Sequence, residues 1–131
     1  MFTIELPYPP SVNRYYRHVG FRTLISREGR AYRRTVCAIL RRAGVRPLDG
    51  TLAVGLDLYP ADHRTRDADN AQKALLDAMQ HGGAFRDDSQ VKKLLTIMRD
   101  TVVPGGRVIV CVFPLDPSTV KEIQHEIAAR N

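Results

Sequence analysis

The sequence predicts an α/β protein of the α+β kind: a mixed sheet of about four strands, two helices packed on it and a short C-terminal helix. Its 131 residues, 44% of them hydrophobic, suffice for one core and are too few for two ordinary domains. Segments with strand periodicity alternate with segments of helical periodicity, and the chain has no internal repeat. We therefore expect one domain over residues 1–131, with 116–131 as a C-terminal helical extension.

The first third of the chain is expected to hold a strand, a loop, an edge strand and one long helix. FTIEL alternates apolar and polar residues as a strand does, whereas the prolines of PYPPSVNRYYRH predict an ordered, extended loop. RTLIS is typical of a short edge strand. Ser26 can then cap a helix to about Ala43, with Gly44 as its stop. The apolar stripe of this helix comprises Tyr32, Val36, Ile39, Leu40 and Ala43.

The middle of the chain has the clearest periodicity. LAVGLDLY places its leucines and Val54 on one face, which predicts a half-buried strand over Leu52–Tyr59. A second helix follows and is expected to end at Gly82 or Gly83. Its apolar positions have helical spacing: Ala71, Ala74, Leu75, Ala78 and Met79.

Two more strands and a helix complete the prediction. KKLLTIMRDTVV and RVIVCVF are read as strands joined by PGG in a hairpin, with Gly105 or Gly106 at positive φ. Asp116 is expected to cap a last helix that has Pro117 at its first position. Its apolar face would comprise Val120, Ile123 and Ile127.

The charge distribution points to a polyanionic partner. The net charge is +6, and residues 1–50 contain ten arginines, no lysine and three acids. Arginine binds phosphate through two parallel hydrogen bonds, which favours phosphate contacts over a charged face that serves solubility alone. There is no 18-residue apolar run and no signal-peptide pattern, so we expect no membrane segment and a cytoplasmic protein. Two cysteines without CxxC spacing are typical of reduced thiols.

The stretch RDADN precedes the second helix and contains Asp67 and Asp69. One interpretation is a capping box, with Asp69 as N-cap and Gln72 three residues later. That interpretation does not explain Asp67. It also leaves unexplained Lys73, which opposes the helix dipole in the first turn, and the second acidic pair, Asp87 and Asp88.

A divalent cation is the alternative explanation of these acids. Two residues apart in extended backbone, Asp67 and Asp69 project to one side, where they could hold a hard cation. Asp88 could join them if the strand after it runs alongside LAVGLDLY. Oxygen ligands without His or Cys favour Mg²⁺ or Mn²⁺ over zinc. A calcium loop does not fit, because Gln72 occupies the position that needs glycine.

The chain resembles the RusA family of Holliday junction resolvases. The segments that carry the resemblance are LPYPPSVNRYYRH, SREGRAYR, RDADNAQKALLDAM, FRDDSQV and PGGRV, and their span from first to last takes in nearly all of residues 4–113. The resemblance implies a homodimeric, Mg²⁺- or Mn²⁺-dependent endonuclease that binds four-way junction DNA and nicks two strands symmetrically. Two departures are Arg86, where familiar members have apolar residues, and the helix after Asp116.

The resemblance also assigns roles to residues. It implies catalytic roles for Asp67, Asp69, Lys73 and Asp88, with the three aspartates as metal ligands. Asp87 matches a less critical, secondary acid. We expect Lys73 to steady the scissile phosphate or the leaving oxygen, the alternative being a surface lysine paired with Asp69 or Asp77. The expected DNA contacts are Asn13, Arg14, Arg17, Arg30, Arg33, Arg34, Arg66 and Asn70.

Three tyrosines and two rival functions remain open. Tyr15, Tyr16 and Tyr32 could stack on unpaired bases near the crossover, or they could belong to the core. The chain could also be a non-catalytic module that binds DNA junctions, in which the acids only cap a helix. A third possibility is a nuclease for other branched nucleic acids.

Overall fold

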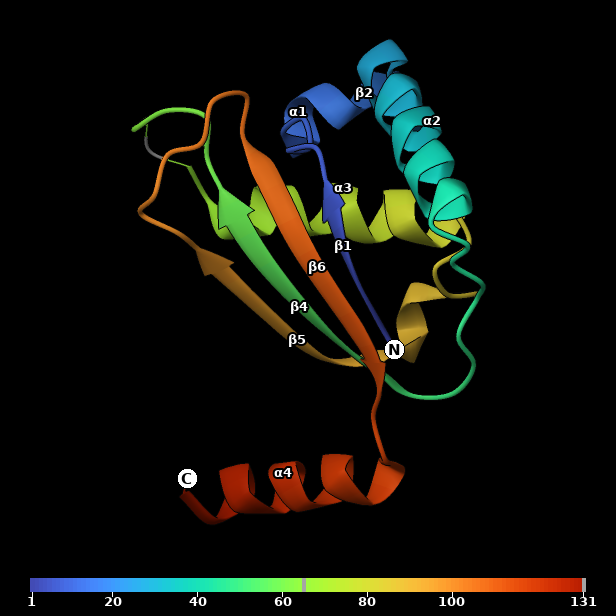
Figure 1. Ribbon diagram of the computed structural model, residues 1–131, viewed down its shortest axis with the longest axis vertical. Helices are drawn as coiled ribbons and strands as arrows, with labels where there is room; N and C mark the ends of the chain where they lie inside the picture. Colours follow the sequence, from blue (N-terminus) through green and yellow to red (C-terminus); the bar gives the residue numbers. More distant parts are fainter. Residues whose placement is uncertain (65, 131) are drawn as a thin grey trace.

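The computed structural model describes residues 1–64 and 66–130. Its larger part is a four-stranded sheet with helices on one face (Figure 1). The elements follow the chain as β1 (Phe2–Leu6), α1 (Val12–Tyr15), β2 (Tyr16–Val19), β3 (Arg22–Ile25), α2 (Arg27–Arg42), β4 (Leu52–Tyr59), α3 (Ala68–His81), the 3-10 helix η1 (Asp88–Gln90), β5 (Val91–Met98), β6 (Arg107–Pro114) and α4 (Pro117–Arg130).

The sheet is mixed, with the strand order β1-β6-β4-β5. β6 pairs antiparallel with both β1 and β4, whereas β4 and β5 run parallel and α3 connects them. The mixed sheet of four strands is confirmed. The predicted hairpin between the last two strands is wrong, because β4 lies between β5 and β6. The turn itself has the expected glycines, and both Gly105 and Gly106 have positive φ.

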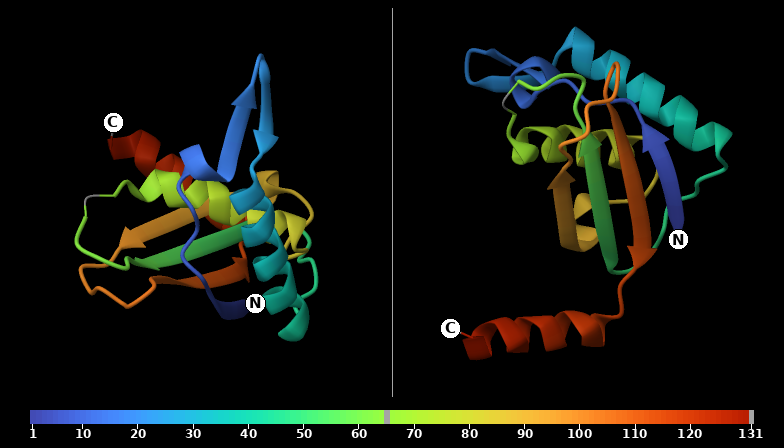
Figure 2. Two further views of the ribbon diagram at one scale, coloured as in Figure 1. Left: turned by 90° about the horizontal axis from the view of Figure 1, so that it is seen from above. Right: turned by 60° about the vertical axis from the view of Figure 1, so that its left-hand side comes forward.

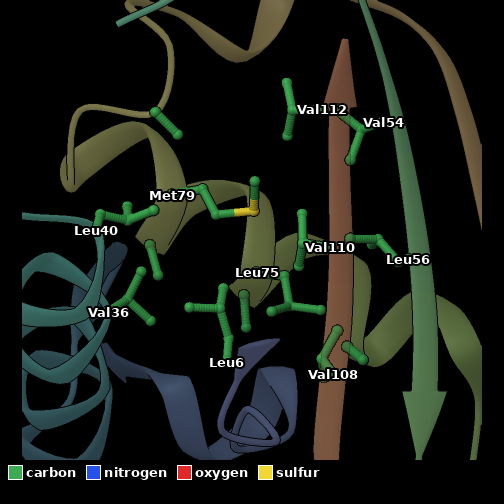
Figure 3. Packing of buried hydrophobic residues seen from close by; sticks show 14 of the residues in the cluster. Leu6, Val36, Leu40, Val54, Leu56, Leu75, Met79, Val108, Val110 and Val112 are labelled. Carbon is green, nitrogen blue, oxygen red and sulfur yellow. The ribbon is translucent and has the colours of Figure 1, made fainter. Parts of the chain in front are cut away.

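The core lies between the sheet and the helices α2 and α3 (Figure 3). β4 contributes Leu52, Val54, Leu56 and Leu58, all of them buried, as their alternation predicts. The five apolar positions predicted for α3 are all buried as well. The hydrophobic periodicity therefore predicted the core-facing residues of β4 and of α3 correctly.

The ends of α2 and α3 follow from their capping residues. Ser26 is the N-cap of α2, and its Oγ accepts a hydrogen bond from the Gly29 N–H at 2.9 Å. Gly44, directly after the C-cap, has φ +72°, a conformation that glycine adopts without strain. α3 ends at the C-cap Gly82, and Gly83 has φ +86°.

The N-terminal segment is more regular than the sequence predicts. The prolines end at Pro10, and the Ser11 carbonyl then accepts hydrogen bonds from the N–H groups of Arg14 and Tyr15, which closes the single turn of α1. β2 follows and pairs with β3 in a two-stranded sheet of its own. The prediction of an extended loop is therefore wrong beyond Pro10, and RTLIS pairs within a separate hairpin (Figure 2).

α4 begins at Pro117, as predicted, and the Ser118 N–H donates to the Asp116 carboxylate at 3.0 Å. It lies apart from the other helices, past the end of β6 (Figure 1). Of its predicted apolar face, Ile127 is exposed, and the side chains of Val120 and Ile123 lie outside the described part of the structure. In the parts of the chain that the structure describes, no helix is both long and apolar enough to span a bilayer.

Candidate active site

Asp67 and Asp69 lie at the N-terminal end of α3. Asp67 occupies the N-cap position in extended backbone, and its side chain makes no capping hydrogen bond. The helix begins at Ala68, so Asp69 lies in the first turn, and the interpretation of Asp69 as N-cap is wrong. Both residues are exposed, and among residues 1–64 and 66–130 neither carboxylate has a hydrogen bond or ion pair. Helix capping thus gives no account of either acid.

A pocket of about 510 Å³ opens beside Asp67. One wall comes from the segment that leads into α1, and the other from the loop before α3. Arg66 is fixed in that loop by an ion pair with Asp62 at 2.8 Å, and its guanidinium lies 5.9 Å from the centre of the Tyr8 ring. The lining residues are Tyr8, Pro9, Pro10, Ser11, Arg14, Arg64, Arg66, Asp67, Asn70 and Ala71. Arg64 and Arg66 both pair with Asp62, whereas Arg14 has no ion pair in the described part of the chain and suits a phosphate group.

Lys73 lies one turn along α3 from Asp69. Its Nζ is 4.9 Å from the centre of the Tyr16 ring. This cation–π contact holds the exposed ammonium over the ring. The alternative in which Lys73 pairs with Asp69 or Asp77 finds no support among the described residues, because no such ion pair forms. Asp77 is instead bound by Arg33, at 2.8 Å. The Lys73 charge is therefore available to a ligand.

A network of three side chains joins α1, α2 and α3. The Tyr15 hydroxyl donates to the Asp77 carboxylate, and Arg33 donates to the same carboxylate oxygen and to the Tyr15 hydroxyl. Burial, then the hydrogen bond to Asp77, raises the pKa of Tyr15 well above its usual value. Tyr15 is fully buried, and its ring meets the ring of Tyr16 edge to face. The network thereby fixes the ring on which Lys73 rests.

The second acidic pair lies in and before η1. Asp87 is the N-cap of η1, and its hydrogen bond from the Ser89 N–H lowers the pKa of its carboxyl. Asp88 is exposed, and its N–H donates to the side chain of Gln80 at 2.9 Å. The Asp87 carboxylate is thus bound by the Ser89 N–H within its own turn. The Asp88 side chain is exposed to solvent.

Asp88 lies at the opposite end of α3 from Asp67 and Asp69. Gln80, its neighbour, is about three helical turns from Asp69, or roughly 16 Å along the axis. The reason is topological: β5 does run alongside β4, but it runs parallel, so the residues before β5 lie at the end of the sheet where β4 starts. The parallel pairing that was expected to bring Asp88 close keeps it away. In the described part of the chain, no group of three His, Cys, Asp or Glu could hold a metal ion.

The predicted DNA contacts fall into two classes. Exposed and turned to solvent are Asn13, Arg14, Arg17, Arg30, Arg34 and Asn70. Arg33 and Arg66 are instead occupied by Asp77 and Asp62. A second hollow between α2 and α3 is lined by Arg30, Arg33, Arg34, Cys37, Ala38, Arg41 and His81. The arginines of α2 thus form a basic face that borders the last turn of α3.

Of the three tyrosines considered for base stacking, two belong to the core and one lies beside Lys73. Tyr15 and Tyr32 are buried, and the Tyr32 hydroxyl donates to the Pro7 carbonyl at 2.8 Å, so neither is available for base stacking. Burial, then the charge of Asp77, raises the pKa of Tyr16, and Asp88 adds a smaller effect in the same direction. The contact of Tyr16 with Lys73 was not predicted, and no spacing in the sequence indicates it.

Comparison with known proteins finds a family model and several relatives that match most of this chain. The family model described as Endodeoxyribonuclease RusA matches residues 7–112. A crossover junction endodeoxyribonuclease RusA from Shigella sonnei is 44% identical over 110 residues, 81% of this chain and 88% of the relative. One from Enterobacteria phage 82 is 43% identical over the same shares. Another, from Escherichia coli, is 38% identical over 118 residues, 87% of this chain and 95% of the relative. The region that the family model matches ends before α4.

Proposed function

The chain belongs to the RusA family of endodeoxyribonucleases, and we propose that it is a metal-dependent enzyme that resolves four-way DNA junctions. The relatives named above are crossover junction endodeoxyribonucleases, which are hydrolytic nucleases. The proposed reaction is the hydrolysis of one phosphodiester bond in each of two strands of like polarity. Because its substrate is cellular DNA, we also place the enzyme in the cytoplasm.

One observation carries the proposal: two carboxylates without described protein partners lie at the start of α3, and one of them, Asp67, lines an arginine-rich pocket. Asp67 and Asp69 face solvent at the start of α3, and Arg14 lines the pocket next to Asp67. Exposed carboxylates repel DNA, so in a chain of net charge +6 their position at the start of α3, next to an arginine-lined pocket, calls for a bound cation. In a module that only binds DNA these acids would contribute no more than their interaction with the helix dipole, since neither makes a capping hydrogen bond in the described structure.

The donor set suits Mg²⁺ or Mn²⁺. Asp67, Asp69 and Asp88 are the residues that would hold the ion, and all three offer oxygen donors of the kind these ions prefer. When bound, the ion would neutralise charge that develops on the phosphate and lower the pKa of the attacking water. Lys73 donates to a phosphate oxygen or to the departing oxygen, and Arg14 binds a neighbouring phosphate. The arginines of α2 hold the rest of the DNA backbone.

Two ligands on one chain leave the metal site incomplete, and a homodimer supplies the third. If two copies pair about a two-fold axis with their α3 helices antiparallel, Asp88 of one copy faces Asp67 and Asp69 of the other. The same symmetry produces two identical sites, which matches two symmetric cuts in a junction. Two observations support this arrangement. Within one chain, the length of α3 separates Asp88 from Asp67 and Asp69, and all three aspartates are exposed.

The test is cleavage of a mobile four-way junction by the purified protein, with Mg²⁺ or with EDTA. We expect paired nicks with Mg²⁺ only, and binding without cleavage in EDTA. Asp69→Asn should abolish cleavage and leave junction affinity intact or higher, because it removes a negative charge that faces DNA. Asp100→Asn, the same change at an exposed acid after β5, is the matched control and should cut normally. Near-normal cutting by Asp69→Asn would remove Asp69 from the site.

A further inference from the structure

The hairpin of β2 and β3 projects from the body of the protein (Figure 2, left). The described pairing joins β2 and β3 only to each other, from Tyr16 opposite Ile25 at the base to Val19 opposite Arg22 at the tip. Gly20 and Phe21 form the turn. Phe21 is fully exposed, and Val19 beside it is half exposed. A phenyl ring thus stands at the outermost point of the hairpin.

The fold does not require an aromatic residue at this position. Gly20 has φ +60°, as the first central residue of a two-residue hairpin turn, and Phe21 has no positive φ. Most residues could occupy the second position, and a polar one would leave no large apolar ring open to contact with other molecules. We therefore look for a binding partner that covers the Phe21 ring.

The charge around the hairpin identifies the class of occupant. The segment from Leu6 to Arg27 contains four arginines, one histidine and no acid. Arg17 and Arg22 lie on the hairpin itself and are exposed. A second copy whose hairpin met this hairpin across a two-fold axis would bring the same positive charge against it, which disfavours a hairpin-to-hairpin contact between two copies. A polyanion with flat apolar faces fits both features, and nucleic acid bases on a phosphate backbone have this character.

We infer that Phe21 stacks on an unpaired base at the crossover of the junction, while Arg17 and Arg22 hold the adjacent phosphates. The inference rests on the proposed function and explains how the enzyme would distinguish a junction from duplex DNA, in which every base is already stacked. Tyr16, at the base of the hairpin, touches Lys73. Four residues of strand span about 13 Å, so the tip lies about that far from the base of the hairpin, where Lys73 would contact a phosphate.

The test compares three hairpin variants with the wild type, in EDTA, on a four-way junction and on linear duplex. Phe21→Leu keeps apolar bulk without an aromatic face, Phe21→Trp restores stacking, and Val19→Ala is the matched control on the same hairpin. The junction carries the fluorescent base 2-aminopurine at successive positions around the crossover. We expect Phe21→Leu to lose about five- to 150-fold in junction affinity, the effect of about 1–3 kcal/mol of base stacking.

The remaining results separate the alternatives. Duplex affinity should be equal in all four proteins, and 2-aminopurine should respond near the crossover with wild type, Phe21→Trp and Val19→Ala but not with Phe21→Leu. If wild type prefers junctions and Phe21→Leu does so equally, with the same fluorescence response, the hairpin inference is wrong and the proposed function stands. A wild type that binds junction and duplex alike overturns both.

Discussion

Replacement of Gly29 by alanine tests how the N-terminal segment is held against α2. Gly29 lies in the first turn of α2, where the backbone of Tyr15 passes directly over it. A Cβ at this position would lie 2.3 Å from the Tyr15 carbonyl oxygen and 2.9 Å from Cγ2 of Ile25. A Cβ carbon in a folded protein does not approach another residue so closely, so α1 must move away from α2 in the variant.

The expected cost of Gly29→Ala can be worked out from these contacts. Overpacking against backbone costs up to about 3 kcal/mol. The displaced Tyr15 carbonyl also weakens the hydrogen bond that it accepts from the Ser26 N–H at 2.9 Å, worth about 1 kcal/mol. Alanine favours a helix over glycine by about 1 kcal/mol. The net loss is about 3 kcal/mol, or a fall in Tm of roughly 10 °C for a chain of this size.

Thermal unfolding and urea denaturation of Gly29→Ala measure this loss. Gly55→Ala is the control, because a Cβ on that residue of β4 has no described atom within 4 Å, and its Tm should be unchanged or higher. We also expect slower junction cleavage by Gly29→Ala below its Tm, since α1 carries Arg14 and leads to Tyr16. A Gly29→Ala protein with wild-type or higher Tm would refute the packing of α1 on α2.

Three further outcomes follow from individual side chains. Lys73→Ala should cut junctions at least about a hundredfold more slowly in single turnover, with little change in Tm, because the ammonium is exposed; a large loss of Tm would make Lys73 structural. Arg34→Gln should lower the dependence of log affinity on log salt by about 0.9 per lost phosphate contact, whereas Arg33→Gln should mainly destabilise the fold, because Arg33 is ion-paired. Equal salt slopes for wild type and Arg34→Gln would exclude that contact. Burial, above all, raises the pKa of Tyr32 above its usual value, so its contribution to the free energy of unfolding is complete below about pH 10 and is lost as the pH rises further. Above about pH 10 the free energy of unfolding of Tyr32→Phe should therefore decline less steeply with pH than that of the wild type. An identical decline in the two proteins would contradict the burial of that hydroxyl.

The sequence predicted the elements whose burial follows a simple period. β4 and α3 each place apolar residues at one spacing, and the same residues form the core. The signals at the helix ends, Ser26 and Gly44, are local and were also read correctly. These features depend only on residues within one turn or one strand of each other.

Strand partners and the N-terminal hairpin could not be predicted in the same way. β5 and β6 are neighbours in sequence, but β4 separates them in the sheet, and no pattern within a strand specifies its partner. In PYPPSVNRYYRH the prolines suggested extended backbone throughout, whereas Ser11 starts a helical turn directly after Pro10. The network of Tyr15, Arg33 and Asp77 joins residues that are far apart in sequence.

In the candidate site, too, the local features could be predicted from the sequence and the long-range ones could not. Asp67, Asp69 and Lys73 lie within two turns at one helix end, and their proximity follows from the sequence alone. The position of Asp88 depends on the direction of β5 relative to β4, which the spacing does not contain. The structure separates Asp88 from the first pair, and that separation is the reason to propose a site shared between two copies.

Purified mixed dimers test the shared site most directly. Subunits with Asp69→Asn and Asp88→Asn are combined, and dimers with one copy of each are isolated by two different affinity tags. Each variant alone should be inactive, but the mixed dimer retains one intact site and should nick a single strand of the junction at about half the wild-type rate. Mixed dimers of Asp67→Asn and Asp69→Asn should stay inactive, since neither of their sites is whole. An inactive Asp69→Asn and Asp88→Asn mixed dimer would contradict the shared site and place all ligands on one chain.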